Sequence, residues 1–431
     1  MMTDTNGRFA VNRLFAAARI RSFLLAFVLL ASLGAAFARD DSPRELSLKD
    51  RREIFEEVWE TIHEKYYDPK FNGVDWFKVR EDYRPIVETA KTDDEFYLLM
   101  KRMVAELRDA HTRFHTPRER RERERSFSIG VGIALSEVEG QIVVTRVEAD
   151  SEASLAGVKA GMILRSVDGR PVAEKMTEMS SRLGESSSER ATRLRLHREL
   201  LEGEAGAPVS LGLIAPDGKP FDVTLARQVV STAPKVMAIR LASDIAYLKF
   251  NVWKSHVHSE IKRALQQMRS AHGLILDLRG NPGGEAHEVL EVADYFFNQR
   301  VSFGSFFSRE GKTIELRTSR KKRVYSGPVA ILIDEASGSG SELFAAAMQE
   351  QSRAVVVGRA SCGCVLGIAR FKRLEGGSEL AVSELGYRTS AGRRLEGAGV
   401  APDVTVALRL IDLQSGRDVA LEQAEKILRS R

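Results

Sequence analysis

From residue 239 onward, short apolar runs alternate with amphipathic stretches, and this alternation limits the possible fold more than any other feature of the sequence. Strands are predicted at 245–250, 273–278, 329–333 and 354–357, and helices at 255–269, 285–297 and 342–350. Alternating strands and helices predict an α/β layer with a largely parallel sheet. Ligands of such sheets gather at the carboxyl ends of the strands. The Gly- and Ser-rich segments 279–284 and 334–341, which each follow a strand, are therefore candidate site loops.

Two segments of different character precede this layer. Apolar residues recur at helical spacing between 47 and 110, which predicts a helical hairpin or small bundle. Residues 127–229 contain short β-type runs separated by turn signals such as Asp168-Gly169, and they predict a compact, mostly β module. A chain of 431 residues has room for two to three domains. The predicted division is a helical domain at 47–117, a β module at 126–229, an α/β core at 236–410 and a C-terminal helix at 411–431.

The first residues have the pattern of a secretory signal peptide. Several arginines precede the apolar run 23–33, and Ala36-Phe37-Ala38 follows it as a small-x-small cleavage site. We therefore predict a signal peptide at 1–38, cleavage after Ala38, and export to the periplasm. The apolar run is short for a membrane span of about 20 residues. An uncleaved anchor, with association to the membrane, is the alternative.

Charge and cysteine content exclude several classes of function. The chain has 65 Lys and Arg against 60 Asp and Glu, and its most Arg-rich stretch, 118–125, interleaves Arg with Glu. This stretch is typical of a solvated connector, so we expect no nucleic-acid partner. The only cysteines, Cys362 and Cys364, are too close together to favour a disulfide and have no second pair for zinc, so we expect two buried thiols. No metal or organic cofactor is implied.

The two candidate loops contain residues suited to acyl transfer. Ser337-Gly338-Ser339-Gly340-Ser341 lies between an apolar strand and a helix, whose N-terminus can stabilise an oxyanion. Glycine N–H groups in the loop 277–284 could complete an oxyanion hole. A helix N-cap and a plain turn are the alternatives for these two loops. A serine nucleophile also needs a base, and among the eight histidines His111 directly follows a predicted helix.

Several segments in the right order resemble the tail-specific, or C-terminal processing, peptidases. They are LILDLRGNPGGE (274–285), LIDEASGSGSELFAAAMQE (332–350), GVAPD (399–403) and LRDAHT (107–112). IGVGIAL (129–135) and AGVKAGMILRSVDGRPV (156–172) look like a PDZ domain. The resemblance implies an α/β multidomain fold, with an N-terminal helical segment, an inserted PDZ-like β module and a catalytic core of the crotonase or tail-specific-protease type.

The resemblance also implies roles for individual residues. Ser339 would be the nucleophile, and the N–H groups of Gly283 and Gly340 would form the oxyanion hole. Members of the Ser/Lys type carry a lysine in a Gly-Lys-Gly segment after the serine, but Cys364 stands in that place here. A thiol is not a suitable base for serine, because as a thiolate it would itself be the better nucleophile.

The tricorn branch of the superfamily lacks this lysine, and its G-x-V-[IL]-G-I pattern is matched by residues 363–368. By this resemblance the base is His111 and the glutamate that orients it is Glu396, which together with Ser339 gives a nucleophile–base–orienter triad. The serine that precedes the histidine in the tricorn branch is Ala110 here.

The PDZ-like loop also has an implied role. Gly130, Val131, Gly132 and Ile133 resemble the loop that holds a peptide's terminal carboxylate while the peptide adds as a strand. A β-turn within a small barrel is the alternative.

The sequence therefore predicts an exported serine endopeptidase that cleaves unfolded or C-terminally tagged polypeptides through an acyl-enzyme. An inactive member of the family that binds peptides as a scaffold is the second hypothesis. A cysteine nucleophile at Cys364 is the third.

Overall fold

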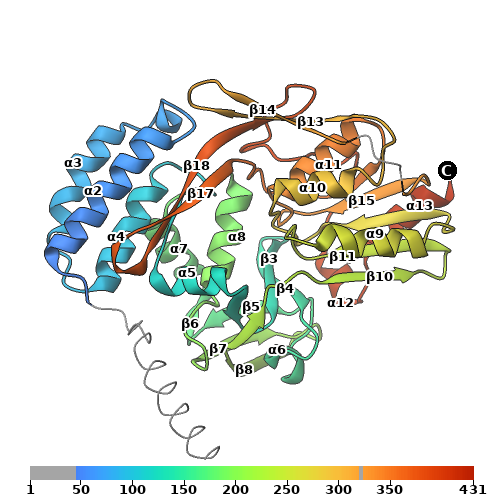
Figure 1. The fold of residues 1–431 in the computed structure, drawn as a ribbon. Helices are drawn as coiled ribbons and strands as arrows, with labels where there is room; N and C mark the ends of the chain where they lie inside the picture. Colours follow the sequence, from blue (N-terminus) through green and yellow to red (C-terminus); the bar gives the residue numbers. More distant parts are fainter. Residues whose placement is uncertain (1–44, 320–323) are drawn as a thin grey trace, which may run out of the picture. The chain divides into compact units, whose positions relative to one another are not determined.

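The computed structural model describes residues 45–319 and 324–431 (Figure 1). The predicted signal peptide, 1–38, lies outside the described residues. Among the described helices, none combines the length and the apolar character that crossing a bilayer requires.

A six-stranded sheet forms the centre of the α/β layer, with the strand order β10-β11-β12-β15-β16-β19. Its strands are β10 (Val236–Arg240), β11 (Ile245–Phe250), β12 (Gly273–Asp277), β15 (Val329–Ile333), β16 (Val355–Gly358) and β19 (Val404–Thr405). β10 is antiparallel to β11, and every other pairing is parallel. The four strands predicted from the apolar runs are confirmed to within a residue.

Helices cover both faces of this sheet, because side chains along a strand point alternately to opposite faces. Leu248, Leu276 and Ile331 pack on the side of α9 (Val257–Gln267), α10 (Ala286–Ala293) and α11 (Gly340–Glu350). Tyr247, Ile275 and Leu332 pack on the opposite side, against α13 (Val419–Arg429).

The C-terminal segment differs from the prediction of one helix at 411–431. The structure has two helices, α12 (Leu410–Gln414) and α13, with a turn between them. Gly416 has φ +71° in that turn, a conformation that ends a helix. The side chain of Asp418 then accepts a hydrogen bond from the N–H of Leu421 and caps α13.

Helices α2 (Leu48–Lys65), α3 (Trp76–Val87) and α4 (Asp93–Ala105) form the helical front, followed by the short strand β1 (Arg113–His115). Their N-cap side chains, Ser47, Asp75 and Thr92, each accept a backbone N–H. These elements fall within the segment predicted to be helical.

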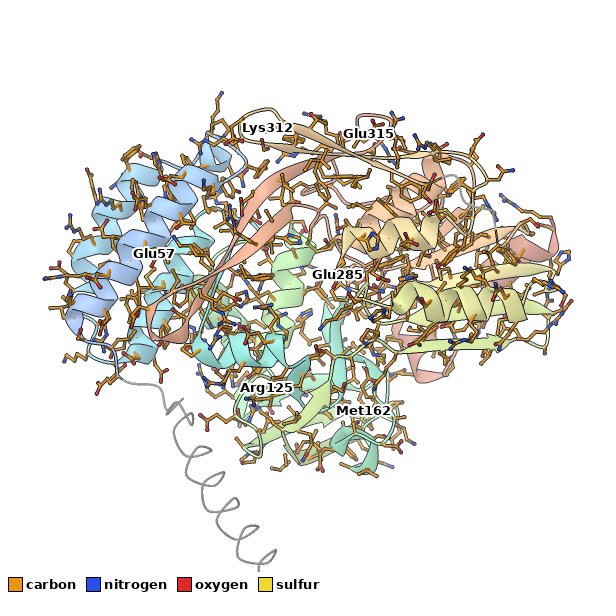
Figure 2. The ribbon with its side chains drawn as sticks, viewed as in Figure 1. Glu57, Arg125, Met162, Glu285, Lys312 and Glu315 are labelled. Atoms are coloured by element: carbon orange, nitrogen blue, oxygen red, sulfur yellow. A yellow bond between two sulfur atoms is a disulfide. The ribbon has the colours of Figure 1, made fainter. Side chains whose placement is uncertain are left out.

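A long hairpin of β17 (Gly367–Arg373) and β18 (Glu379–Arg388) connects the helical front with the α/β layer. β18 pairs with β1 near one end and with β13 (Ser302–Ser308) near the other, and β13 pairs with β14 (Thr313–Arg317). Leu380 and Val382 are buried in the core of the front, and Lys372 pairs with Glu57 at 2.9 Å. Glu57 lies on α2 (Figure 2). The sequence analysis predicted no strand here.

The β module contains an antiparallel sheet with the strand order β3-β4-β5-β7-β8, which places β3 at an edge. Its elements are β3 (Ile133–Val138), β4 (Gln141–Val147), α6 (Glu152–Leu155), β5 (Ile163–Val167), β6 (Arg170–Pro171), α7 (Val172–Leu183), α8 (Glu189–Glu199), β7 (Pro208–Ile214) and β8 (Pro220–Ala226). β2 (Phe127–Gly130) pairs with β9 (Gln228–Ser231) where the chain enters and leaves the module.

The Arg- and Glu-rich stretch 118–125 connects β1 to β2 and is partly exposed, as its charge pattern suggested, but it is also folded and attached to the rest of the chain. Most of it forms the helix α5 (Pro117–Glu124). Arg123 pairs with the buried carboxylate of Glu379 on β18 at 2.7 Å, and Arg120 donates to the carbonyl of Gly377 at 2.8 Å. Contacts between distant segments therefore attach this helix to the β17–β18 hairpin.

Candidate active site

Ser339 lies on a strained turn between β15 and α11. It has φ 47° and ψ −114°, which a residue with a side chain rarely adopts. Its N–H lies 2.9 Å from the carbonyl oxygen of Cys364 and 3.0 Å from a carboxylate oxygen of Glu342. A strained serine between a strand and a helix is typical of a nucleophile elbow, which exposes the hydroxyl to substrate.

The glycines predicted to form the oxyanion hole lie directly against this turn. A Cβ atom placed on Gly283, which has φ +99°, would lie 2.6 Å from both the Cβ of Ser339 and the amide nitrogen of Gly340, so only glycine fits there. Gly340 is the first residue of α11, and its N–H therefore has no acceptor within the helix. The N–H of Gly283 donates to Oδ1 of Asn281 at 3.0 Å.

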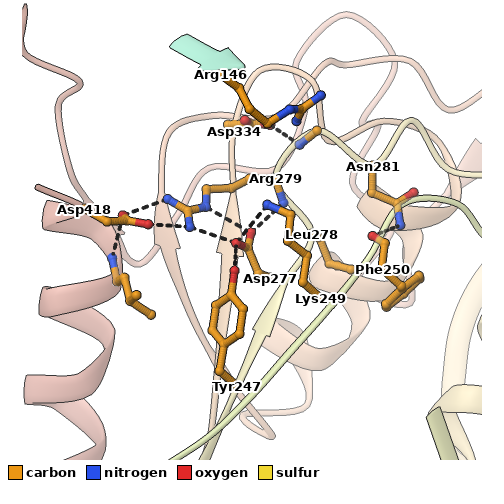
Figure 3. Close-up of polar contacts among 12 residues, drawn as sticks. Arg146, Tyr247, Lys249, Phe250, Asp277, Leu278, Arg279, Asn281, Asp334 and Asp418 are labelled. Atoms are coloured by element: carbon orange, nitrogen blue, oxygen red, sulfur yellow. Dashed lines mark hydrogen bonds and ion pairs between the residues drawn. The ribbon is translucent and has the colours of Figure 1, made fainter. Parts of the chain in front are cut away.

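An ion network anchors the loop that carries Gly283 (Figure 3). The buried carboxylate of Asp277 accepts hydrogen bonds from Tyr247 at 2.6 Å, from Lys249 at 3.2 Å and from Arg279 at 2.8 Å. Arg279 also pairs with Asp418 of the C-terminal segment at 2.8 Å. Burial opposes the ionisation of Asp277, but the charge and hydrogen bonds of Arg279, with Lys249 and Tyr247, outweigh it and hold the pKa of Asp277 below its usual range.

The buried carboxylate of Glu342 joins the nucleophile turn to the segment 361–365. It accepts hydrogen bonds from the N–H of Ser339, the hydroxyl of Ser361 at 2.6 Å and the N–H groups of Gly363 and Cys364 at 2.7 and 2.9 Å. Burial raises the pKa of Glu342, while these donors act in the opposite direction. The sequence analysis did not single out Glu342, although Ser339-x-x-Glu342 matches the capping-box pattern that could have identified it.

Cys362 and Cys364 form a disulfide, so the expectation of two buried free thiols is wrong. Gly363 between them has φ +75°, and the turn brings their Cα atoms to 5.3 Å, within the range that a disulfide spans. The sequence separation of the two cysteines did not predict the disulfide, because it does not show how the backbone turns at Gly363. A disulfide-bonded Cys364 offers no thiolate to act as a base or a nucleophile.

Glu396 lies on the other side of the segment 361–365 from Ser339. One of its carboxylate oxygens accepts the N–H of Val365 at 2.7 Å, and the nearby hydroxyl of Ser187 acts to lower the pKa of the carboxyl. Burial, with a contribution from the charge of Asp109, raises the pKa of Glu396 to about 8.

His111 lies in the loop between α4 and β1, and its backbone N–H donates to Asp109 at 2.6 Å. Burial lowers the pKa of its imidazole, which therefore stays neutral at pH 7; Asp109 acts in the opposite direction. Ring atom Nδ1 is buried and has no hydrogen-bond partner among the described residues. The adjacent Ala110 packs against the Cys362–Cys364 pair.

The structure therefore brings some of the predicted site residues into contact and leaves others without a direct contact. Ser339, Gly283 and Gly340 are in contact. Glu396 and the turn that carries His111 both border the segment 361–365. In residues 45–319 and 324–431, no hydrogen bond joins the ring of His111 to Ser339 or Glu396. In the same residues, no group of His, Cys, Asp and Glu side chains could hold a metal ion.

The predicted carboxylate-binding loop connects β2 to β3. Val131 is buried in the core of the module, and Gly132 has φ +81°. A Cβ on Gly132 would lie 2.2 Å from the Cβ of Ser151, so the close approach of Ser151 requires glycine.

Comparison with known proteins finds matches to peptidases along most of the chain. The model of peptidase family S41 matches residues 244–406, and the model of the tricorn protease C1 domain matches residues 47–105. The chain is 26% identical to a carboxyl-terminal-processing protease of Synechocystis, over 95% of this chain and 93% of that one. It is 28% identical to the chloroplastic carboxyl-terminal-processing peptidase 2 of Arabidopsis thaliana, over 94% of this chain and 77% of that one. It is 27% identical to the putative tricorn protease homolog 2 of Streptomyces coelicolor, over 87% of this chain and 32% of that one.

Solved structures give the same assignment. The photosystem II D1 C-terminal processing protease superposes with a TM-score of 0.60 at 25% identity, over 88% of this chain and 97% of that one. Mature CPAF shares the fold, with a TM-score of 0.68 at 12% identity over 88% and 96% of the two chains. The fold and these matches define a peptidase of the S41 class. The chain belongs to the C-terminal processing peptidase superfamily.

The Asp277 network predicts a pH-dependent loss of stability. We expect Asp277→Asn to lower the free energy of unfolding at pH 7 by about 1.5–3 kcal/mol, because the partly buried Lys249 and Arg279 lose their hydrogen bonds to a charged acceptor. The pKa of Asp277 is lowered in the folded protein, so its stabilising contribution is complete above the ordinary aspartate pKa of about 3.9 and declines as the pH falls below it. The difference between variant and wild type in denaturant unfolding should therefore narrow below about pH 4. Asp217→Asn in an exposed turn is the control, and a difference that stayed constant with pH would contradict the prediction.

Proposed function

We propose that the protein is an exported serine endopeptidase that cleaves unfolded or C-terminally tagged polypeptides through an acyl-enzyme. The observation that carries the proposal is the strained Ser339 turn, with Gly283 and the free helix N-terminus at Gly340 packed against it. The C-terminal processing activity in the names of its relatives supports the class of substrate.

In the proposed reaction, the hydroxyl oxygen of Ser339 attacks a peptide carbonyl while the neutral imidazole of His111 takes the hydroxyl proton. The N–H of Gly340 stabilises the oxyanion of the tetrahedral intermediate, together with the N–H of Gly283, which turns to the oxyanion from Oδ1 of Asn281. His111 then gives the proton to the leaving amine, and an acyl group remains on Ser339. A water molecule, deprotonated by the same imidazole, hydrolyses this ester.

Two unfavourable features support a rearrangement that completes the triad. The Nδ1 atom of His111 is buried without a hydrogen bond, which costs about 1–3 kcal/mol. Burial also leaves Glu396 largely protonated at pH 7, because its pKa is about 8. A hydrogen bond from Nδ1–H of His111 to the Glu396 carboxylate would give Nδ1 a partner and would also stabilise the ionised form of Glu396. We infer that the loop of His111 and the segment 361–365 close together when substrate binds.

The edge strand β3 supports the proposed docking of a peptide on the PDZ-like module. A cavity of about 220 Å³ lies between β3, α8 and the α/β layer. Its lining includes Ser136, Leu194, His197, Glu335 and Arg359. A peptide could add as a strand beside β3 with its terminal carboxylate at the loop of Gly130 to Ile133. Since Glu335 belongs to the loop that leads to Ser339, a docked peptide would lie close to the nucleophile.

An inactive, peptide-binding scaffold is the second candidate function. The observation in its favour is that the ring of His111 has no hydrogen bond to Ser339 or Glu396 in the part of the chain that the structure describes. The two candidates differ in whether Ser339 reacts.

The proposed triad predicts the behaviour of substitutions. We expect Ser339→Ala and His111→Ala to lower turnover of an unstructured protein by about 10³-fold or more, because each removes a reacting group. Cys364→Ala should retain activity, because the sulfur of Cys364 takes no part in the proposed reaction. Turnover is measured on the mature chain, and a fluorophosphonate probe tests the reactivity of Ser339. Full activity in His111→Ala would exclude the proposed base, and an unlabelled Ser339 with retained peptide binding would favour the scaffold.

The pKa of Glu396 predicts an unusual pH profile. The ionised carboxylate accepts Nδ1–H of His111 more strongly than the neutral acid does, and only its charge stabilises the imidazolium that forms. The pKa of about 8 means that ionisation occurs above neutrality. We therefore expect kcat/KM to rise with pH and to level off above about pH 8, since this ratio reports groups of the free enzyme. Glu396→Gln should abolish this rise of kcat/KM with pH, together with most of the activity. Glu204→Gln, at an exposed site, should leave the pH profile unchanged. A flat profile between roughly pH 6 and 9 would contradict the assignment.

The docking proposal predicts a dependence on the substrate's terminal carboxylate. Amidation of a substrate peptide's C-terminus should raise KM by about 10- to 100-fold, because hydrogen bonds to the charged group are lost. The kcat value should change little, because the reacting groups are untouched. The same peptide with a free carboxylate is the matched control. Equal KM values for the two peptides would exclude recognition of the terminus.

A further inference from the structure

A loop of the β module reaches the proposed catalytic residues of the other two parts of the chain. It connects α7 to α8 and contains three consecutive serines, 186–188. The hydroxyl oxygen of Ser187 accepts the backbone N–H of Ala110 at 2.8 Å. The same hydroxyl lies close enough to the carboxylate of Glu396 to lower its pKa. One side chain thus bridges the turn of His111 and the proposed orienting glutamate.

The neighbours of Ser187 hold this loop in place on the α/β layer. The hydroxyl of Ser188 donates to the carbonyl of Cys362 at 2.5 Å. The guanidinium of Arg190 donates to the carbonyls of Ser361 and Ala398, each at 2.6 Å. These contacts attach the loop to residues 361 and 362 and to Ala398, so the loop is held in place independently of the Ser187 hydroxyl.

We infer that Ser187 is a positioning residue, supplied by the β module, which holds the base-bearing turn and the orienting carboxylate of the proposed triad in register. The inference rests on the proposed function, because it gives His111 and Glu396 their roles. Ser187 touches none of the reacting atoms, so it acts through these two residues. Ala110, which precedes the base, has no hydroxyl of its own.

The surroundings of Glu396 explain why a hydroxyl is needed there. Asp109 and Glu342 both oppose ionisation of Glu396, and the phenols of Tyr66 and Tyr67 also lie within electrostatic range of it. Both phenols are hydrogen-bonded to the side chain of Asn72 instead. Ser187 and the N–H of Val365 are the donors that favour the charged form of Glu396.

The neighbouring Ser186 provides a matched control for substitution of Ser187. The hydroxyl of Ser186 is buried and has no hydrogen-bond partner in the described part of the chain. Ser186→Ala and Ser187→Ala therefore remove the same atom from adjacent positions, but only the second removes a contact with the proposed site.

The experiment compares full steady-state kinetics and pH profiles of the mature wild type, Ser186→Ala, Ser187→Ala and Ser187→Thr on one unstructured substrate. We expect Ser187→Ala to lower kcat by about 10- to 100-fold, because a hydrogen bond to a charged group is lost. KM should stay within roughly twofold, since Ser187 does not touch substrate. The limb of the pH profile assigned to Glu396 should move to higher pH, because removing a donor to the carboxylate raises its pKa. Ser187→Thr should recover most of the activity, and Ser186→Ala should match the wild type.

The outcomes separate this inference from the proposed function. A wild type that turns over substrate through Ser339, but in which Ser187→Ala behaves like Ser186→Ala, would overturn the inference and leave the proposed function standing. An unshifted pH limb with a lowered kcat would also overturn it, because it would indicate only a structural role. A wild type without turnover would overturn both. Should Ser187→Ala fail to fold, Ser187→Thr and Ser187→Val, which differ in the hydroxyl but hardly in shape, give the same comparison.

Discussion

The buried carboxylate of Glu342 is the interaction on which the arrangement of the candidate site depends. It accepts hydrogen bonds from Ser339, Ser361, Gly363 and Cys364, and so joins the nucleophile turn to the segment beside it. Each of these donors would cost about 1–3 kcal/mol if left buried and unpaired. The strained backbone of Ser339 is therefore held by a contact that lies outside the proposed chemistry.

The segment 361–365 is the common border of parts that are far apart in the sequence. Ser339 contacts one side of it, while Glu396 and the turn of His111 contact the other. The β17–β18 hairpin, which follows this segment, extends into the helical front and pairs with β1 just after His111. The proposed base therefore depends for its position on the packing of the front, whereas the nucleophile depends on the α/β layer.

The disulfide in the segment 361–365 limits the chemistry that this site can perform. The resemblance in the sequence places the lysine of the Ser/Lys type at Cys364, whereas a disulfide and a glycine turn occupy the segment. His111 has a neutral imidazole whose Nδ1 has no partner among the described residues. Glu396 has a carboxyl group with a raised pKa that contacts the same segment. Under the proposed function, a hydrogen bond between these two groups would pair Nδ1 and stabilise the ionised carboxyl.

The sequence by itself determined those features whose causes are local. The alternation of apolar runs specified β11 and β15, because a strand buried on both faces needs a continuous apolar run. The two Gly- and Ser-rich loops were identifiable because each follows a predicted strand, and the family resemblance singled out Ser339 and Gly283 within them. The structure adds that close backbone approach excludes a larger residue at Gly283. Only the tertiary structure decided the Cys362–Cys364 bond, the β17–β18 hairpin, the contacts of Ser187 and the orientation of the His111 ring. Each of these depends on contacts between segments brought together by folding or on the shape of a turn, and no local periodicity records such contacts.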